Sequence, residues 1–148
     1  MPLNRRADLR SSAFTITTKV RFHPVPPYDQ AGLLVCLNPN CWIKTSVEYE
    51  SHGPACLGAV VTNHGFSDWS VQDFPRATHE VCLRIWKAAA DFIIEFAANE
   101  HANWNRMRIA HLNLENAASL SCGRYACSPK GDGFRAEFES LEIAHRAD

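Results

Sequence analysis

The stretch CWIKTSVEYE, residues 41–50, alternates apolar and polar side chains with a period of two. One face collects apolar and β-branched residues and a tyrosine: Ile43, Thr45, Val47 and Tyr49. The other face collects polar residues and one tryptophan: Trp42, Lys44, Ser46 and Glu48. Because successive side chains of a β-strand point to opposite faces, this pattern predicts a strand with one buried face. The second face would carry polar groups beside an aromatic ring.

The same alternation recurs in short segments along most of the chain. These predicted strands cover residues 14–22, 31–37, 56–62, 80–86 and 134–143. Between them lie segments with the Asn, Gly and Pro residues that tight connections require, at 38–40, 51–54, 63–65 and 128–133. Short strands with such regular turns predict an all-β sandwich.

One segment, KAAADFIIEFAANEH at 87–101, is compatible with two structures. Its alanines and the spacing of Phe92, Ile93 and Phe96 would suit an amphipathic helix. However, Phe92, Ile94 and Phe96 also alternate with Ile93 and Glu95, as in the neighbouring segments. We therefore predict a strand over 91–97, flanked by turns.

Length and charge restrict the class of protein. The 148 residues fit a single domain over 1–148, with a poorly ordered or variable segment at 1–13 and the sandwich over 14–143. A formal net charge of -1 gives no electrostatic reason to expect nucleic acid or an anionic membrane as a partner. The first residues resemble no secretion signal, and no apolar run is long enough to span a bilayer, so we expect a cytoplasmic protein.

The cysteines and histidines form no recognisable metal-binding pattern. The six cysteines include no CxxC pair and the seven histidines no HxH or HExxH pair. Without a secretion signal, we expect reduced thiols rather than disulfides. No metal site and no cofactor are predicted.

Five stretches of the chain together resemble a known family. They are YDQAGLLVCLNPNCWIKTSVEYE (28–50), VVTNHGFSDWS (60–70), VCLRIWK (81–87), NWNRMRIAHL (103–112) and YACSPKGDGFRAEFESLEI (125–143). In this order they are similar to the fungal regulation-of-enolase protein and its bacterial relatives, a family of unknown biochemical function. The resemblance implies a concanavalin A-like lectin/glucanase sandwich, also called a jelly roll.

The sequence departs from the family pattern in three places. Family members usually begin with an aromatic-rich segment that provides outer strands, whereas this chain begins with MPLNRRADLR. We expect the sandwich to lack those strands, which would leave a sheet edge unpaired and favour a homodimer through that edge. KAAAD and AANEHANW replace turns that the family builds with glycine, so these hairpins are the least certain part of the predicted fold.

The polar face of the 41–49 strand supplies the first candidate ligand-binding residues, Trp42, Lys44 and Glu48. An indole ring stacks on the C–H surface of a sugar, and charged groups bind its hydroxyls. The alternative is that Trp42 shields a sheet edge while Lys44 and Glu48 form ion pairs across strands. Asp68 and Trp69 are further candidates on opposite faces of one strand; we expect Trp69 to pack and Asp68 to lie on the polar side.

Four more polar residues are candidate ligand contacts. Asp29 and Gln30 come before a strand and could orient a ligand, although an aspartate beside a Pro-rich turn more often closes that turn. Arg84 and Arg108 each lie between apolar neighbours and could bind a carboxylate or phosphate. The alternative for both arginines is pairing with a glutamate across the sheet.

The sequence identifies no catalytic residue. EFESLE, residues 137–142, resembles the acidic strand of sandwich-fold glucanases, but it lies on the last predicted strand. Glu137, Glu139 and Glu142 are better explained as a solvated strand face. Cys127 has no His–carboxylate pair that could activate it.

The hypothesis that we favour is a non-catalytic module that binds a carbohydrate-like ligand or a protein partner, with a regulatory role implied by the family resemblance alone. The alternative is a glycoside-acting hydrolase on the same sandwich. A third possibility is a degraded paralogue without independent function. The sequence leaves the question of catalysis undecided and favours the module.

Overall fold

The computed structural model describes residues 5–8 and 13–146, and every regular element in these ranges is a β-strand. The strands are β1 (Arg5–Asp8), β2 (Ala13–His23), β3 (Gln30–Asn38), β4 (Cys41–Glu48), β5 (Ala55–Asn63), β6 (Phe66–Phe74), β7 (Glu80–Ala88), β8 (Asp91–Ala97), β9 (Asn105–His111), β10 (Ser119–Cys127) and β11 (Arg135–Arg146). These ranges contain no helix long and apolar enough to cross a membrane.

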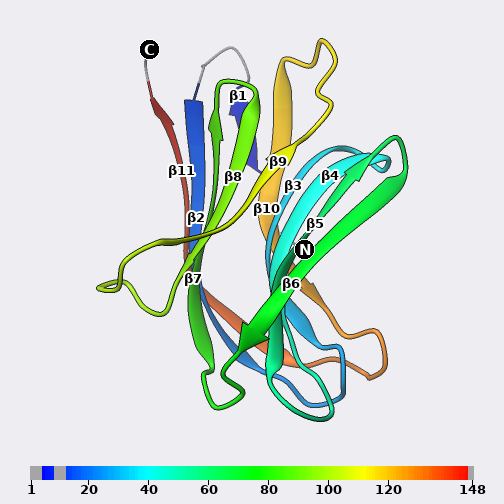
Figure 1. Ribbon diagram of the computed structural model, residues 1–148, viewed down its shortest axis with the longest axis vertical. Helices are drawn as coiled ribbons and strands as arrows, with labels where there is room; N and C mark the ends of the chain where they lie inside the picture. The colour runs from blue at the N-terminus through cyan, green and yellow to red at the C-terminus, as the bar shows by residue number, and fades with distance from the viewer. Residues whose placement is uncertain (1–4, 9–12, 147–148) are drawn as a thin grey trace.

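The strands form two antiparallel sheets that face each other (Figure 1). The six-stranded sheet has the order β1-β10-β3-β4-β5-β6, and the five-stranded sheet has the order β11-β2-β7-β8-β9. Consecutive strands pair with each other within β3 to β6 and β7 to β9, whereas β2, β10 and β11 pair with strands far away in the sequence. The predicted all-β sandwich is confirmed.

The core lies between the sheets and is built from the alternating apolar positions. In β4, Ile43 and Val47 are buried, and in β2 the buried positions include Phe14, Ile16 and Val20. Burial of each such side chain contributes about 1.5–3 kcal/mol, which is why one face of every central strand is fixed. The core-facing set of β4 ends at Val47, because the strand stops at Glu48 and half-buried Tyr49 lies instead beneath the Arg76 guanidinium.

The ambiguous segment 87–101 contains β8 and no helix, as predicted. Its side chains are buried on both sides, because Phe92 and Ile94 enter the core while Ile93 lies opposite Trp86 on the outer face. The preceding turn departs from the glycine-bearing pattern. Ala89 adopts the positive φ, 54°, that a glycine would favour there.

Strand β1 was not predicted, since residues 1–13 were expected to form a variable segment. Arg5–Asp8 pairs with β10 and buries Ala7, while residues 1–4 and 9–12 lie outside the described ranges. Four mostly charged residues show no alternation that would identify a strand. The pairing with β10 is what makes this segment extended, and it covers one edge of the six-stranded sheet.

The opposite edge of that sheet is β6. Asn63 pairs with Phe66 across a two-residue turn in which His64 and Gly65 both have positive φ, as hairpin turns of this length require. Most of β6 is exposed on both faces, and only Phe74 is buried. Its burial pattern therefore lacks the period of two seen in β2.

Candidate functional site

The outer face of the six-stranded sheet carries the candidate site. Cross-strand pairing aligns Leu34, Lys44, Val60 and Trp69 in one row over β3, β4, β5 and β6. A parallel row contains Gln30, Glu48, Cys56 and Asp73. Lys44 and Glu48 thus lie near the middle of the sheet, with an exposed indole on one side.

Two glycines lie between these rows, and Gly58 forms the floor beside Trp69. A methyl group at Gly58 would collide with the Ser70 carbonyl oxygen and would lie 3.3 Å from the Trp69 indole nitrogen. A methyl group at Gly32 would collide with the Thr45 carbonyl oxygen. Both glycines therefore permit close strand packing, and Gly58 leaves the surface beside Trp69 hollow.

Gln30 is the centre of a hydrogen-bond network at this site. Its amide oxygen accepts from the Lys44 ammonium at 2.6 Å and from the Tyr125 hydroxyl at 3.1 Å. Its amide nitrogen donates to Glu48 Oε2 at 2.8 Å and to the Tyr28 carbonyl oxygen at 3.2 Å. The Lys44 ammonium also lies 5.0 Å from the centre of the Tyr125 ring. Gln30 thus fixes Lys44 and Glu48 in defined positions.

Burial dominates the electrostatics of this network. It lowers the pKa of Lys44 below its ordinary value, and the Glu48 carboxylate offsets only part of this decrease. Burial likewise raises the pKa of Glu48, with a smaller opposing effect from Lys44. The pKa of Tyr125 is also raised, first by burial and then by its contact with Cys127. The charged forms of Lys44 and Glu48 are thus poorly solvated, and polar ligand groups would solvate them.

Two adjoining hollows share Lys44 and together form what we call the groove. The first, of about 290 Å³, is lined by Lys44, Glu48, Gly58, Trp69 and Val71 among others. The second, of about 270 Å³, is lined by Leu34, Cys36, Trp42, Lys44 and Tyr125. The Trp42 indole nitrogen donates to the Pro39 carbonyl oxygen at 3.1 Å, which holds its ring in place. Trp69 is 59% exposed.

The structure brings together five of the nine predicted site residues: Gln30, Trp42, Lys44, Glu48 and Trp69. Trp69 was expected to pack, and this expectation is wrong. Strand β6 is an edge strand of the sheet, and the Trp69 side chain remains exposed. The alternative interpretation paired Lys44 with Glu48 directly. In the structure both side chains instead form hydrogen bonds to a shared partner, Gln30.

Asp29 is a structural residue rather than a groove residue. Its carboxylate is 2% exposed and accepts hydrogen bonds from the Val25 amide at 2.9 Å and the Ser128 hydroxyl at 2.5 Å. It closes the Pro-rich turn, as the alternative interpretation of this residue stated, and joins it to the loop after β10. Its lone pairs face internal donors and not a ligand.

Asp68 and Arg108 lie on the inner side of their strands and join the edges of the two sheets. Arg108 Nη2 is 3.0 Å from Asp68 Oδ2, and its Nη1 donates to the Ser70 hydroxyl at 3.2 Å. Asp68 was expected on the polar, groove-facing side of its strand, but it lies on the inner side, opposite Trp69, where Arg108 is its partner. Neither residue lines the groove.

Arg84 lies on the outer face of the other sheet. Its Nε donates to Glu95 Oε2 at 2.7 Å, and its guanidinium carbon is 4.1 Å from the centre of the Trp104 ring. This is the cross-strand pairing that was the alternative to a ligand contact.

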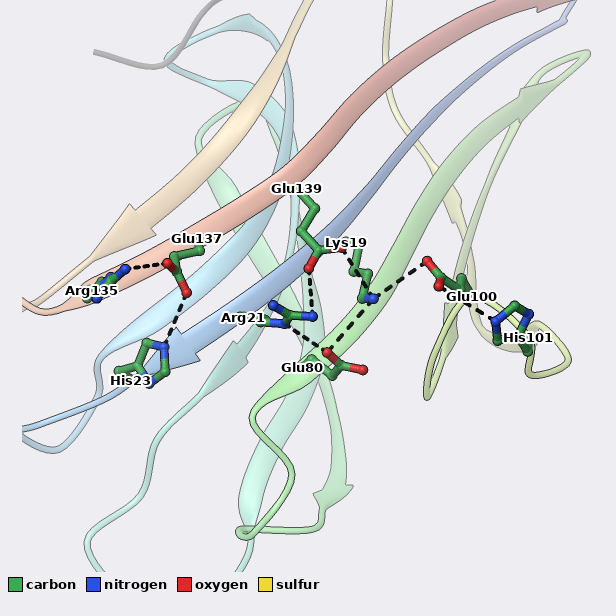
Figure 2. Close-up of polar contacts among 9 residues, drawn as sticks. All are labelled: Lys19, Arg21, His23, Glu80, Glu100, His101, Arg135, Glu137 and Glu139. Carbon is green, nitrogen blue, oxygen red and sulfur yellow. Dashed lines mark hydrogen bonds and ion pairs between the residues drawn. The ribbon is translucent and has the colours of Figure 1, made fainter.

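The glutamates of EFESLE are on the same outer face as Arg84. Figure 2 shows Glu139 of β11 pointing toward Lys19 and Arg21 of β2, and Glu137 pointing toward His23 of β2 and Arg135 of β11 itself. Glu139 lies 3.3 Å from Lys19 and 2.8 Å from Arg21, and Glu137 lies 3.4 Å from His23 and also contacts Arg135. His23 and Arg135 lower the pKa of Glu137 through their hydrogen bonds. Exposed Glu142 is on the same strand, outside the groove.

Sequence reasoning missed Tyr125 and the two glycines between the rows, Gly32 and Gly58. Tyr125 lies directly opposite Gly32, although more than ninety residues separate them in the chain. No local pattern reports such a pairing. A usable signal was available for Gly58, because a glycine inside an alternating strand often marks the close approach of another group.

A larger hollow of about 440 Å³ lies among the turns at one end of the sandwich, lined in part by Asn40, His64, Asn113 and Glu115. Its polar groups bond mainly to one another. Asn113 Nδ2 is 3.0 Å from His64 Nε2, and the Asn113 carbonyl oxygen accepts from the Cys41 thiol at 2.9 Å. These contacts stabilise the turns, so the smaller groove remains the candidate site.

Comparison with known proteins agrees with this fold. A solved structure of a functionally unknown protein from Saccharomyces cerevisiae matches 99% of this chain and 75% of its own length, with a TM-score of 0.85 and 27% identity. A xylan beta-1,4-xylosidase from Bacillus halodurans matches 96% of this chain with a TM-score of 0.80 and 16% identity, but only 29% of the enzyme is covered. This second likeness concerns the fold alone.

Sequence comparison gives the relationship. The chain is 30% identical over 132 residues to Regulation of enolase protein 1 of Saccharomyces cerevisiae. The match covers 89% of this chain and 64% of the yeast protein, so the chain spans less than two thirds of that relative. The model of the family described as "Protein of unknown function (DUF1349)" matches residues 7–146. The chain therefore belongs to the DUF1349 family.

Proposed function

We propose that this protein is a non-catalytic module whose groove binds a carbohydrate-like ligand. The observation that carries the proposal is the juxtaposition of the exposed Trp69 ring with Lys44 and Glu48 over a glycine floor. An aromatic face binds the C–H surface of a sugar ring, and the two charged groups can bind its hydroxyls as acceptor and donor.

The state of the polar groups supports this assignment. Lys44 and Glu48 are held by Gln30, so a ligand would meet groups that are already positioned. Little of the binding free energy would then be spent on ordering these side chains. Their pKa shifts indicate that both charges lack solvation. Hydroxyl groups would supply hydrogen bonds without adding a net charge.

The alternative function, glycoside hydrolysis, requires two carboxyl groups about 5–10 Å apart at one sugar. Glu137 and Glu139 are ion-paired on the other sheet, away from the groove. The carboxylate that lines the groove beside Lys44 is Glu48. The matched xylosidase supports a common fold and carries no catalytic residue over to this chain.

Two further parts of the proposal rest on separate observations. The name of the yeast relative supports a regulatory role. The six cysteines are free thiols, which supports a reducing compartment such as the cytoplasm.

Titration with a panel of mono- and oligosaccharides tests the function, with calorimetry as the readout that the wild type and the variants share. We expect at least one saccharide to bind, and Trp69→Ala to weaken binding at least about tenfold, because ring stacking is lost. Phe66→Ala is the matched control, since Phe66 is an exposed aromatic of the same strand outside the hollows. Absence of any saccharide binding would overturn the proposal in favour of a protein partner.

A hydrolysis assay with the same panel distinguishes the enzyme. The module predicts that every saccharide is recovered intact. Hydrolysis that disappears in Glu48→Gln, or in Glu137→Gln together with Glu139→Gln, would show that the protein is an enzyme.

A further inference from the structure

The four edges of the two sheets differ in how they are protected from pairing. Strand β1 has only four residues and carries arginines. Strand β9 has an irregular register opposite Ile94 and Glu95, and it carries Arg106 and Arg108. Strand β11 has an irregularity between Phe138 and Ser140. Short length, bulges and basic side chains are the usual means of blocking edge-to-edge association. Strand β6, all of whose residues are described, is nine residues long and pairs with β5 in a continuous register. Its sequence, FSDWSVQDF, contains neither lysine, arginine nor proline.

The free backbone groups of β6 can be assigned from its hairpin. In a hairpin with a two-residue turn, the residues that flank the turn bond to each other, so Phe66 directs its amide and carbonyl toward β5. Alternation then directs those of Ser70 toward β5 as well, which agrees with the close approach of its carbonyl oxygen to Gly58. The amides and carbonyls of Ser67, Trp69, Val71 and Asp73 consequently point away from the sheet.

We propose that β6 pairs antiparallel with β6 of a second copy of this chain, about a two-fold axis through Ser70. This register overlaps the whole strand and aligns the free backbone groups, with up to about eight hydrogen bonds between the copies. It places Trp69 opposite Val71 of the second copy. These side chains are 59% and 51% exposed in the single chain, and the pairing buries apolar surface on both.

The same register is complementary in charge. Asp68 lies opposite Gln72 of the second copy, and Asp73 lies opposite Ser67 of the second copy, so each acidic side chain meets a hydrogen-bond donor. Carboxylates of the two copies are kept apart: Asp68 and its equivalent are four residues out of register, about 13 Å along the strand, and Asp73 of the second copy, which lies beside Asp68, points to the other face of the sheet. Phe66 of the first copy, which is 81% exposed, lies opposite Phe74 of the second.

The dimer would also change the groove. Trp69 forms its wall at the sheet edge, and in the paired sheet the second copy's Val71 and Trp69 continue that wall. Two grooves would then meet at the two-fold axis and accept a longer ligand. This last consequence rests on the proposed function, whereas the dimer does not.

Sedimentation equilibrium over a range of concentrations, without saccharide, tests the dimer separately from ligand binding. We expect the wild type to dimerise and Val71→Lys to weaken dimerisation at least about tenfold, because a lysine on an edge strand opposes pairing. Val25→Lys is the matched control, since Val25 is 72% exposed in a loop distant in sequence from β6. A wild type that remains monomeric at about 100 μM would overturn the proposal, as would equal effects of the two lysines.

Disulfide cross-linking tests the register. Two Ser70→Cys chains would bring their cysteine Cα atoms about 4.5 Å apart at the axis, within disulfide range. Two Ser67→Cys chains would place theirs about 20 Å apart. We expect covalent dimers for Ser70→Cys above the wild-type background and none for Ser67→Cys. Cross-linking of Ser67→Cys in preference to Ser70→Cys would overturn this register.

Discussion

The outer faces of the two sheets are built from the same alternating pattern but have opposite chemistry. On the five-stranded sheet, cations and carboxylates pair with each other: Lys19 contacts Glu80, Glu100 and Glu139, and Arg21 contacts Glu80 and Glu139 (Figure 2). On the six-stranded sheet, one lysine and one glutamate share a glutamine beside exposed aromatic and apolar groups.

The difference supports the proposal that one face of this sandwich is used for binding. Charges that are already paired gain little from a ligand, since any new contact replaces an existing one. Charges that are positioned but poorly solvated gain hydrogen bonds when a polar ligand arrives. In the proposed function, the hollow over Gly58 is where such a ligand would enter. Substitutions on the two faces should therefore have different effects.

The largest effect is expected from Gly32→Ala on the groove face. The added methyl group would meet the Thr45 carbonyl oxygen, so β3 and β4 would have to separate, at a cost of about 2–4 kcal/mol in the free energy of unfolding. Urea denaturation followed by tryptophan fluorescence measures this change. Ser46→Ala, at the neighbouring position of β4, is the control. A Gly32→Ala protein as stable as wild type would show that the close strand approach does not exist.

The second prediction compares one cation from each face. Arg84→Met leaves Glu95, which is nearly buried, without its partner and should lower the unfolding free energy by about 1–3 kcal/mol. Lys44→Met removes a poorly solvated charge and should change stability by less than about 1 kcal/mol while weakening saccharide binding. The same denaturation curves test both. A larger loss for Lys44→Met than for Arg84→Met would reverse the proposed difference between the faces.

The third prediction is a difference in pH dependence between two glutamates. Burial raises the pKa of Glu48, so its contribution to stability is present below its unfolded pKa and is lost as pH rises through the higher folded pKa. Hydrogen bonds from His23 and Arg135 lower the pKa of Glu137, so its contribution is present above its unfolded pKa and is lost as pH falls through the lower folded pKa.

Unfolding curves at about pH 7 and about pH 4 for the two glutamine variants measure this difference. At the higher pH, Glu48→Gln should be at least as stable as wild type and Glu137→Gln less stable. Both differences should shrink toward the lower pH. The same sign for the two variants at neutral pH would contradict the assigned environments.

The smallest effect is expected from Glu139→Gln. Lys19 keeps Glu80 and Glu100, and Arg21 keeps Glu80, so the urea midpoint should move less than in Arg84→Met. Raising NaCl from about 0.05 M to about 0.5 M should reduce the difference from wild type, since exposed ion pairs are screened. A difference that is independent of salt would mean that Glu139 acts through packing and not through its charge.

The sequence predicted the strands whose one face enters the core, because burial imposes the period of two. Thus β2, β4 and even alanine-rich β8 were identified. Strands β1, β9 and β10 were not. Strand β1 is four residues long, β9 has no buried face with a period of two, and β10, SLSCGRYAC, has no β-branched residue. All three become strands through their partners. For exposed β6, alternation separated Asp68 from Trp69 but did not show which side faced outward.

The candidate site was predictable only where one strand supplies it. Trp42, Lys44 and Glu48 lie on the same face of β4, so their proximity follows from alternation. Tyr125 and Trp69 join them through the order of strands in the sheet, which no local pattern contains. Arg84 and Arg108 each lie between uncharged neighbours, as Lys44 of the groove does, so local sequence does not distinguish them from it. Only the assembled sheets show that Arg84 pairs with a glutamate and Arg108 with an aspartate.

The strand order has a consequence for the synthesis of the protein. Strands β2 and β3 leave the ribosome well before their neighbours β11 and β10 have been made. The hairpins of β3 to β6 and β7 to β9 can form as they emerge, while β2 waits for more than a hundred residues to complete its pairing with β11. Folding of the sandwich must therefore finish after translation of residues 135–146, and its slow step is the closure of these distant pairs.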